Sequence, residues 1–150
     1  MKRMTLAAAC LPRVFSEQTT AERYEKHIER YANMVCKRFL GIVRERGIST
    51  GSLLDAGCGT GQMAVGMAEA LPDIEVTGVD LGDAVLTLTQ RRAEREGVAD
   101  RVSTRAANVE ALPYPDDSFD VVLNGSPVLM RSDMLERGDD VTVVAHLDPK

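Results

Sequence analysis

The ten residues SLLDAGCGTG at positions 52–61 decide how the rest of the chain is organised. Two leucines precede a carboxylate, Asp55, and three glycines follow at alternate positions, Gly57, Gly59 and Gly61. The apolar pair predicts a buried strand, and the tract from residue 62 onward predicts a helix. Glycine is needed where the backbone adopts positive φ or passes close to a ligand, and the first amides of a helix attract polar or negative groups. The stretch therefore predicts a strand, a tight turn and a helix start that together bind a nucleotide-like ligand.

A second carboxylate lies about 20 residues beyond these glycines, which is the interval at which nucleotide-binding folds contact ribose hydroxyls. This residue is Asp80, and it closes the apolar run at positions 74–79. A third stretch, NVEALPYPDDSFDVV at positions 108–122, leads into another apolar run. The three stretches follow one another in the order that strands alternating with helices require, so we expect parallel strands with right-handed crossovers.

Together these stretches resemble the class I S-adenosylmethionine-dependent methyltransferases over residues 24–124, and LLDAGCGTG is similar to motif I of that family. The resemblance implies an α/β fold, a Rossmann-like doubly wound and mostly parallel sheet with strand order 3-2-1-4-5. A chain of 150 residues leaves room for about five strands with their helices. We therefore expect the final hairpin of the family to be missing, and a fragment and a minimal variant remain equally open.

The pattern also predicts the extent of each element. We expect residues 1–18 to form an N-terminal tail and residues 19–150 to form the S-adenosylmethionine-binding domain. Asp83 is placed to cap the second crossover helix and Gly97 to end it, while the charges at positions 91–96 predict a solvated face. The expected helices are 19–46, 61–71, 82–96 and 127–137, and the expected strands are 52–55, 75–79, 101–106, 119–123 and 141–147.

Composition narrows the class of partner. The net charge is −5 and the cations are scattered among acids, which disfavours a nucleic-acid substrate because phosphate binding relies on basic patches. No stretch reaches the ~18 apolar residues of a membrane span. Three cysteines without a C-x-x-C pair favour a reduced, cytoplasmic protein, and no grouping around the two histidines has metal-ligand spacing.

The resemblance implies a role for each residue at the glycine turn. Asp55 would help hold the turn and the amino-acid end of the cofactor, although a carboxylate capping the turn's own amides fits the same position. The glycines carry the close approach, and Cys58 is a small packing group that leaves its backbone amide available. Asp80 would accept hydrogen bonds from the ribose hydroxyls, and Leu81 would offer an apolar face to adenine.

Four further residues complete the predicted cofactor site. Asn108 stands where many relatives carry Asp, and its amide could bind the adenine amino group or serve only as a turn residue. Val109 follows it, Asn124 lies where the fourth strand reaches the floor of the site, and Tyr24 either reaches the ligand or only packs. No catalytic residue is identified, because methyl transfer mainly requires the two reactants to be held in line.

The leading hypothesis is therefore an S-adenosylmethionine-dependent methyltransferase acting on a small-molecule acceptor. One alternative is a non-catalytic or partner-dependent binding module, which the exposed fifth strand motivates, since an unpaired sheet edge invites pairing into a homodimer. Another is a different nucleotide-cofactor enzyme, such as a nicotinamide-dependent oxidoreductase. That class expects G-x-G-x-x-G, whereas the third glycine here comes one residue early.

Overall fold

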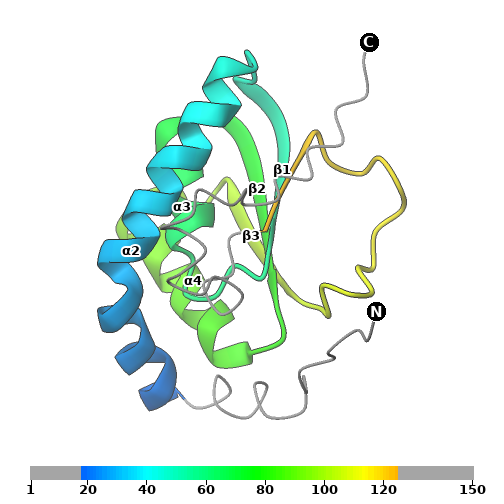
Figure 1. Ribbon diagram of the computed structural model, residues 1–150. Helices are drawn as coiled ribbons and strands as arrows, with labels where there is room; N and C mark the ends of the chain where they lie inside the picture. The colour runs from blue at the N-terminus through cyan, green and yellow to red at the C-terminus, as the bar shows by residue number, and fades with distance from the viewer. Residues whose placement is uncertain (1–17, 125–150) are drawn as a thin grey trace, which may run out of the picture.

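The computed structural model describes residues 18–124 of the chain, with side chains from residue 32 onward. The described part begins with one long helix and then alternates strands with helices (Figure 1). Its elements are α2 (Gln18–Glu45), β1 (Thr50–Ala56), α3 (Gln62–Ala70), β2 (Asp73–Asp80), α4 (Asp83–Arg95), β3 (Val102–Ala106) and β4 (Val121–Leu123). Each was predicted from the sequence, and the largest differences are two residues at the starts of three strands: β1 and β2 begin two residues earlier than predicted, and β4 begins two residues later.

The described strands form one parallel sheet in the order β3-β2-β1-β4. This order confirms the predicted doubly wound topology, because the winding reverses between β1 and β4. Ligands of such folds bind beyond the carboxyl ends of the strands at that reversal. The predicted short helix at 127–137, the fifth strand at 141–147 and the homodimer through its edge concern residues outside the described part of the chain.

Helices cover one face of the sheet, and the long β3–β4 connection covers the other (Figure 1). On the helical face, α2 packs Phe39 and Val43 into a core that also contains residues of α3, β1, β2 and β4. On the opposite face, Tyr114 and Phe119 of the connection pack against the apolar side of β1 and β2. Their rings meet edge to face at a centroid distance of 5.0 Å. The connection thus takes the place of a crossover helix over this part of the sheet.

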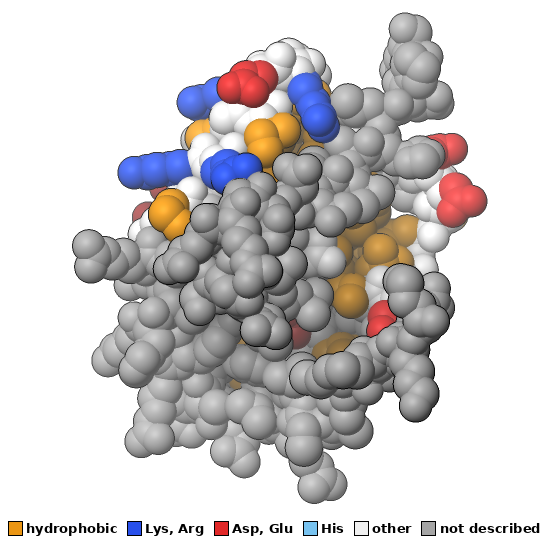
Figure 2. Space-filling model, viewed as in Figure 1, with side chains coloured by type: hydrophobic (Ala, Val, Ile, Leu, Met, Phe, Trp, Pro, Cys, Tyr) orange, Lys and Arg blue, Asp and Glu red, His pale blue; other side chains and the backbone are white. Residues whose placement is uncertain are grey.

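A hollow of about 630 Å³ remains beneath this connection, lined by apolar residues of β1 and β4, by Leu112 and by residues 114–119. Figure 2 shows hydrophobic side chains gathered in a depression on the right of the view, with acidic side chains beside them. Among the described helices, none is long and apolar enough to cross a bilayer.

Glycines end two of the helices. Gly47 after α2 and Gly97 after α4 have φ values of 72° and 71°, a left-handed conformation that favours glycine. The amide of Val98 then donates to the Ala93 carbonyl at 2.9 Å, and that of Gly97 to the Glu94 carbonyl at 3.2 Å, which satisfies the last carbonyls of α4. The prediction for Gly97 is confirmed.

The predicted cap at the start of α4 is wrong. Gly82 occupies the N-cap position and Asp83 lies in the first turn of the helix, with no side-chain hydrogen bond to the cap. The carboxylate that serves this end is instead Asp80, whose Oδ1 accepts from the Gly82 amide at 3.1 Å. The same aspartate thus takes part in the turn before α4 and in the candidate site.

Candidate functional site

The glycine turn joins β1 to α3 with left-handed backbone at each of the predicted positions. The φ angles of Gly57, Gly59 and Gly61 are 81°, 56° and 82°, values at which any residue with a Cβ is strained. The amides of Gly57 and Cys58 both donate to the Val79 carbonyl, at 2.8 and 2.9 Å. The turn therefore folds back onto the end of β2.

Asp80 connects the turn to the next strand. Its Oδ2 accepts a hydrogen bond from the Gly59 amide at 3.0 Å, while its Oδ1 accepts from Gly82. The predicted proximity of Gly59 and Asp80 at one edge of the sheet is therefore confirmed. A carboxylate oxygen has two acceptor positions, so each oxygen of Asp80 keeps one for a further donor.

These hydrogen bonds correct the expectation that the Cys58 amide is available to a ligand. The amides of Gly57, Cys58, Gly59 and Gly61 all donate within the protein, the last of them to the Cys58 carbonyl at 3.0 Å. Among the described residues, no atom lies within 4 Å of a Cβ built on Gly59, so the turn offers close approach at this position. A ligand can therefore lie directly against this glycine.

Two exposed apolar side chains stand beside the same edge. Leu81 is 50% exposed and Val109 39% exposed. Leu81 follows the end of β2, and Val109 lies shortly after the end of β3. These two strands are paired, with Asp80 opposite Ala106, and the Ala107 amide donates to the Asp80 carbonyl at 3.0 Å. Neighbouring apolar groups next to a partly free carboxylate fit a flat aromatic ring attached to a ribose.

Asp55 is enclosed at the end of β1. It is 1% exposed, and neither carboxylate oxygen makes a hydrogen bond among the described residues. Burial raises the pKa of Asp55 from 3.8 to about 7, and the charge of Asp80 adds to that rise, while the nearby Ala64 amide of α3 offsets part of it. A buried carboxylate is costly unless other groups compensate for it. This position could therefore accept a cationic group of a ligand, and the nearby Ala64 amide also fits a cap at the start of α3.

The two described cysteines, Cys36 and Cys58, are free thiols. Burial raises the pKa of Cys36 to about 11, with further increases from the charges of Asp55 and Glu69. Burial likewise raises the pKa of Cys58 well above its usual range. Because the thiolate is the nucleophile, neither is suited to nucleophilic catalysis. The expected packing role of Cys58 is met, but its amide is not available, since it donates to Val79.

The other predicted site residues lie at the same end of the sheet or outside the described side chains. The Asn108 side chain accepts from the Glu110 amide at 3.0 Å, the contact of a turn residue. Asn124 follows the last residue of β4, next to the end of β1. Tyr24 belongs to α2, but its side chain lies outside the part that the structure describes.

Sequence reasoning missed the residues of α4 that contact the turn. Arg92 was assigned to a solvated face, but it is half-buried and its Nε donates to the Thr60 carbonyl at 3.2 Å. Thr89 is fully buried, and its hydroxyl donates to the Gly59 carbonyl at 3.0 Å. No local signal marks either residue, because the contacts join positions about 30 residues apart.

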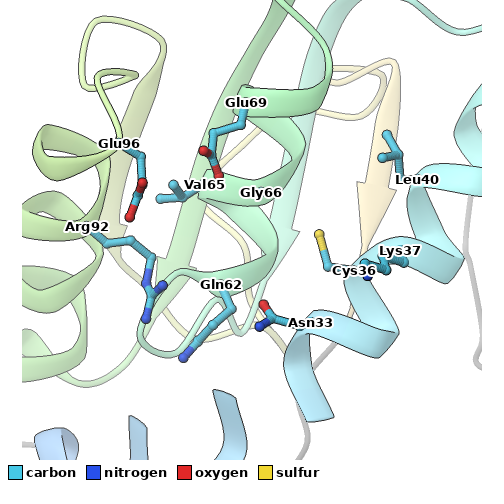
Figure 3. A pocket seen from close by; sticks show the side chains of 10 residues that line it. All are labelled: Asn33, Cys36, Lys37, Leu40, Gln62, Val65, Gly66, Glu69, Arg92 and Glu96. Carbon is cyan, nitrogen blue, oxygen red and sulfur yellow. The ribbon is translucent and has the colours of Figure 1, made fainter. Parts of the chain in front are cut away.

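A groove of about 270 Å³ runs between α2, α3 and α4 (Figure 3). Cys36, Gln62 and Arg92 line it from the three helices in turn. The side-chain oxygen of Gln62 accepts from the Thr60 hydroxyl at 2.7 Å. The side-chain nitrogen of Gln62 is buried without a partner among the described residues. Within the described part, no three His, Cys, Asp or Glu side chains are grouped so as to hold a metal ion.

Comparison with known proteins places the same residues in a family. Residues 53–138 match the family model described as a methyltransferase domain. The 27-O-demethylrifamycin SV methyltransferase of Amycolatopsis mediterranei is 46% identical over 70 residues, which cover 47% of this chain and 25% of that protein. The demethylmenaquinone methyltransferase of Lactiplantibacillus plantarum is 38% identical over 78 residues, covering 51% and 33%. The chain therefore spans a quarter to a third of the length of these relatives.

Solved structures share the fold. A structure from Methanococcus maripaludis described as an S-adenosyl-L-methionine-dependent methyltransferase superimposes with a TM-score of 0.64 at 16% identity, covering 77% of this chain and 53% of that one. The [4+2]-cyclase SpnF superimposes with a TM-score of 0.51 at 34% identity, covering 57% and 32%. The first similarity concerns the fold alone, and the second adds a relative whose name gives a different reaction.

Proposed function

Because this chain belongs to the methyltransferase-domain family and has the class I fold, we propose that it binds S-adenosylmethionine and transfers the methyl group to a small-molecule acceptor. The observation that carries the proposal is the hydrogen bond from the Gly59 amide to Asp80 beside open space at Gly59. This hydrogen bond places the glycine turn beside the carboxylate that we expect to bind the ribose, at one edge of the sheet. The acidic charge balance supports a small-molecule acceptor over a nucleic acid, and the three cysteines without a C-x-x-C pair support a cytoplasmic location.

The residues present fit this cofactor. Asp80 keeps acceptor positions for two ribose hydroxyls. Leu81 and Val109 would offer apolar surface to the adenine, and Asn108 would supply a polar group to it. The unpartnered carboxylate of Asp55 suits the ammonium at the amino-acid end. Asn124 and Tyr24 remain sequence-based predictions for this site.

S-adenosylmethionine, when bound, supplies an activated methyl group on a positively charged sulfur that is a good leaving group. The chain's own residues then need only bind, orient and exclude water. None of the described site residues is assigned as a base. Asp80 accepts from two backbone amides, Asp55 is enclosed at the end of β1, and the thiols of Cys36 and Cys58 remain protonated.

A second candidate is a chain that binds the cofactor without transferring its methyl group. The structural likeness to a [4+2]-cyclase supports it, because a domain of this fold with 34% identity has a different reaction in its name. A nicotinamide enzyme is disfavoured by the family match and by the glycine spacing. Release of S-adenosylhomocysteine in the presence of acceptors would separate methyl transfer from binding alone.

Titration calorimetry with S-adenosylhomocysteine tests the binding itself. We expect the unaltered chain to bind and Asp80→Asn to bind roughly 10- to 100-fold more weakly, because a charged acceptor contributes about 1.5–3 kcal/mol to a hydrogen bond. Asp100→Ala, which removes an equal charge from an exposed position, is the matched control and should leave the affinity unchanged. Absence of binding to the unaltered chain at millimolar ligand would overturn the proposal.

A further inference from the structure

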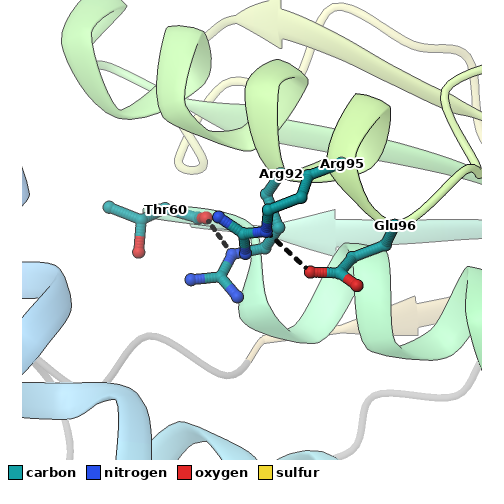
Figure 4. Close-up of polar contacts among 4 residues, drawn as sticks. All are labelled: Thr60, Arg92, Arg95 and Glu96. Carbon is teal, nitrogen blue, oxygen red and sulfur yellow. Dashed lines mark hydrogen bonds and ion pairs between the residues drawn. The ribbon is translucent and has the colours of Figure 1, made fainter.

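The carbonyl side of the glycine turn is held by α4, a helix that supplies none of the predicted site residues. The Oγ1 of Thr89 donates to the Gly59 carbonyl at 3.0 Å and also lies 3.1 Å from the Val85 carbonyl of its own helix. One turn further along, the Nε of Arg92 donates to the Thr60 carbonyl at 3.2 Å (Figure 4). Two consecutive carbonyls of the turn thus accept hydrogen bonds from side chains of α4.

Packing brings α4 as close to the turn as the backbone allows. A Cβ built on Gly61 would lie 2.7 Å from the Cγ2, 2.8 Å from the Oγ1 and 3.0 Å from the Cα of Thr89. Such distances are shorter than real Cβ contacts, and the φ of Gly61 is 82°. Contact with Thr89 and a positive φ therefore both require glycine at position 61, whereas a Cβ on Gly59 would contact none of the described residues.

Gly59 is consequently held from both sides. Its amide donates to the Asp80 carboxylate and its carbonyl accepts from the Thr89 hydroxyl, so the two peptide groups that flank its Cα are each anchored to a side chain of a different element. Glycine has the widest conformational freedom of any residue. Two anchors restrict both of its dihedral angles before any ligand arrives.

We propose that Thr89 and Arg92 are positioning residues for the cofactor, which act by keeping the glycine turn in its binding conformation. The inference rests on the proposed function, since the cofactor is what the turn would receive. Binding is weakened when a segment must be ordered at the moment of binding, and ordering one backbone residue corresponds to about a tenfold change in affinity. Loss of the Thr89 anchor should therefore lower affinity by about that factor.

Paired substitutions at position 89 separate anchoring from packing. Thr89→Val keeps the shape and removes the hydroxyl, whereas Thr89→Ser keeps the hydroxyl and removes the methyl group. We expect Thr89→Val to bind S-adenosylhomocysteine about tenfold more weakly and Thr89→Ser to stay within about threefold of the unaltered chain. A purely packing role predicts the opposite order, because the serine leaves the larger cavity.

A second readout uses the ligand-free chain. Hydrogen exchange followed by NMR should show the Gly59 amide exchanging faster in Thr89→Val than in the unaltered chain, with near-normal exchange in Thr89→Ser. Unchanged affinity and unchanged exchange in Thr89→Val would overturn the inference, and so would equal effects of the two variants. If the unaltered chain fails to bind, the proposed function is lost and the exchange of Gly59 alone decides the inference.

Arg92 provides a variant that is easier to accommodate, since its side chain is only half-buried. Arg92→Met keeps an unbranched stem and removes the donor to Thr60, and we expect a several-fold loss of affinity from it. Arg95→Met is the matched control, because Arg95 is bonded to Glu96 at 2.9 Å and lies one residue before the end of the charge run (Figure 4). Equal affinities of the two variants would contradict the assignment of Arg92.

Discussion

At the scale of single residues, Asp55 has a burial cost that its described surroundings offset only in part. Its carboxyl group is enclosed at the end of β1, and neither oxygen makes a hydrogen bond within the described residues. Folding therefore favours the protonated form of Asp55, chiefly because burial disfavours a charged carboxylate. The ammonium group of the proposed cofactor would offset part of this burial cost.

The raised pKa of Asp55 predicts a pH dependence of folding with a definite sign. Between pH 4 and 7 the folded chain holds a proton on Asp55 that the unfolded chain releases, because burial raises the pKa from 3.8 to about 7. The unfolded state then binds fewer protons, so this group makes the free energy of unfolding fall as pH rises through that window and stay level above it. The fall should be on the order of a few kcal/mol.

Urea unfolding of Asp55→Asn and of the unaltered chain from pH 4 to 8 measures this contribution. The difference between the two free-energy curves removes the titration of all other groups, and we expect it to shift in favour of the variant as pH rises. The same substitution should weaken binding of S-adenosylhomocysteine, since the amide cannot neutralise an ammonium. Parallel curves for the two proteins would contradict the assignment.

At the scale of elements, the end of α3 is secured by an arginine that comes from beyond α4. The Nη1 of Arg101 donates to the Ala68 carbonyl at 2.7 Å, to the Leu71 carbonyl at 3.2 Å and to the Ile74 carbonyl at 3.4 Å. A cation is favourable at a helix C-terminus, where the last carbonyls lack partners within the helix. One guanidinium thus joins the end of α3, the turn after it and the start of β2.

Arg101→Met should therefore lower the free energy of unfolding by about 1–2 kcal/mol, because carbonyls lose a charged donor. Arg91→Met removes an equal charge from an exposed position of α4 and should stay within about 0.5 kcal/mol of the unaltered chain. Urea denaturation measures the free energy of unfolding of both variants, provided that its dependence on urea concentration has the same slope as in the unaltered chain. A loss of stability from Arg91→Met as large as that from Arg101→Met would show a general charge effect instead.

At the scale of the whole molecule, binding at the sheet edge links β1, β2 and the turn, so the ligand should stabilise the entire described domain. A ligand at 100 times its Kd adds about 2.7 kcal/mol to the folded state, which corresponds to roughly 5–10 °C in Tm for a chain of this size. We expect that rise with S-adenosylhomocysteine in thermal unfolding. NADH at the same concentration is the control, and an equal rise with it would favour the oxidoreductase alternative.

The order of elements was predictable because each signal is local. Apolar runs, glycine stops and the carboxylate at position 80 are spaced along the chain as parallel strands and crossovers require, and the sheet confirms that order for β1 to β4. The alternatives at Asn108 and Asp55 could not be separated in this way, because they depend on which groups face those side chains. The structure adds a turn contact for Asn108 and isolation for Asp55.

Contacts between distant elements were beyond the reach of the sequence pattern. Gly66 looks like a weak point inside α3, but a Cβ there would lie 2.7 Å from the Sγ of Cys36, so it permits close packing of α2. The charge run of α4 looks like a solvated face, yet Arg92 donates to the glycine turn. Both roles depend on residues about 30 positions away.

The sequence by itself determined the fold, the family resemblance and the pairing of a glycine turn with Asp80, since these follow from residue types at fixed spacings along one chain. Only the tertiary structure decided that the amides of the turn are already bonded, that Asp55 is without a partner among the described residues and that Thr89 and Arg92 hold the carbonyls. The physical reason is that hydrogen bonds and burial depend on neighbours in space, and packing of α4 against the turn brings those neighbours together.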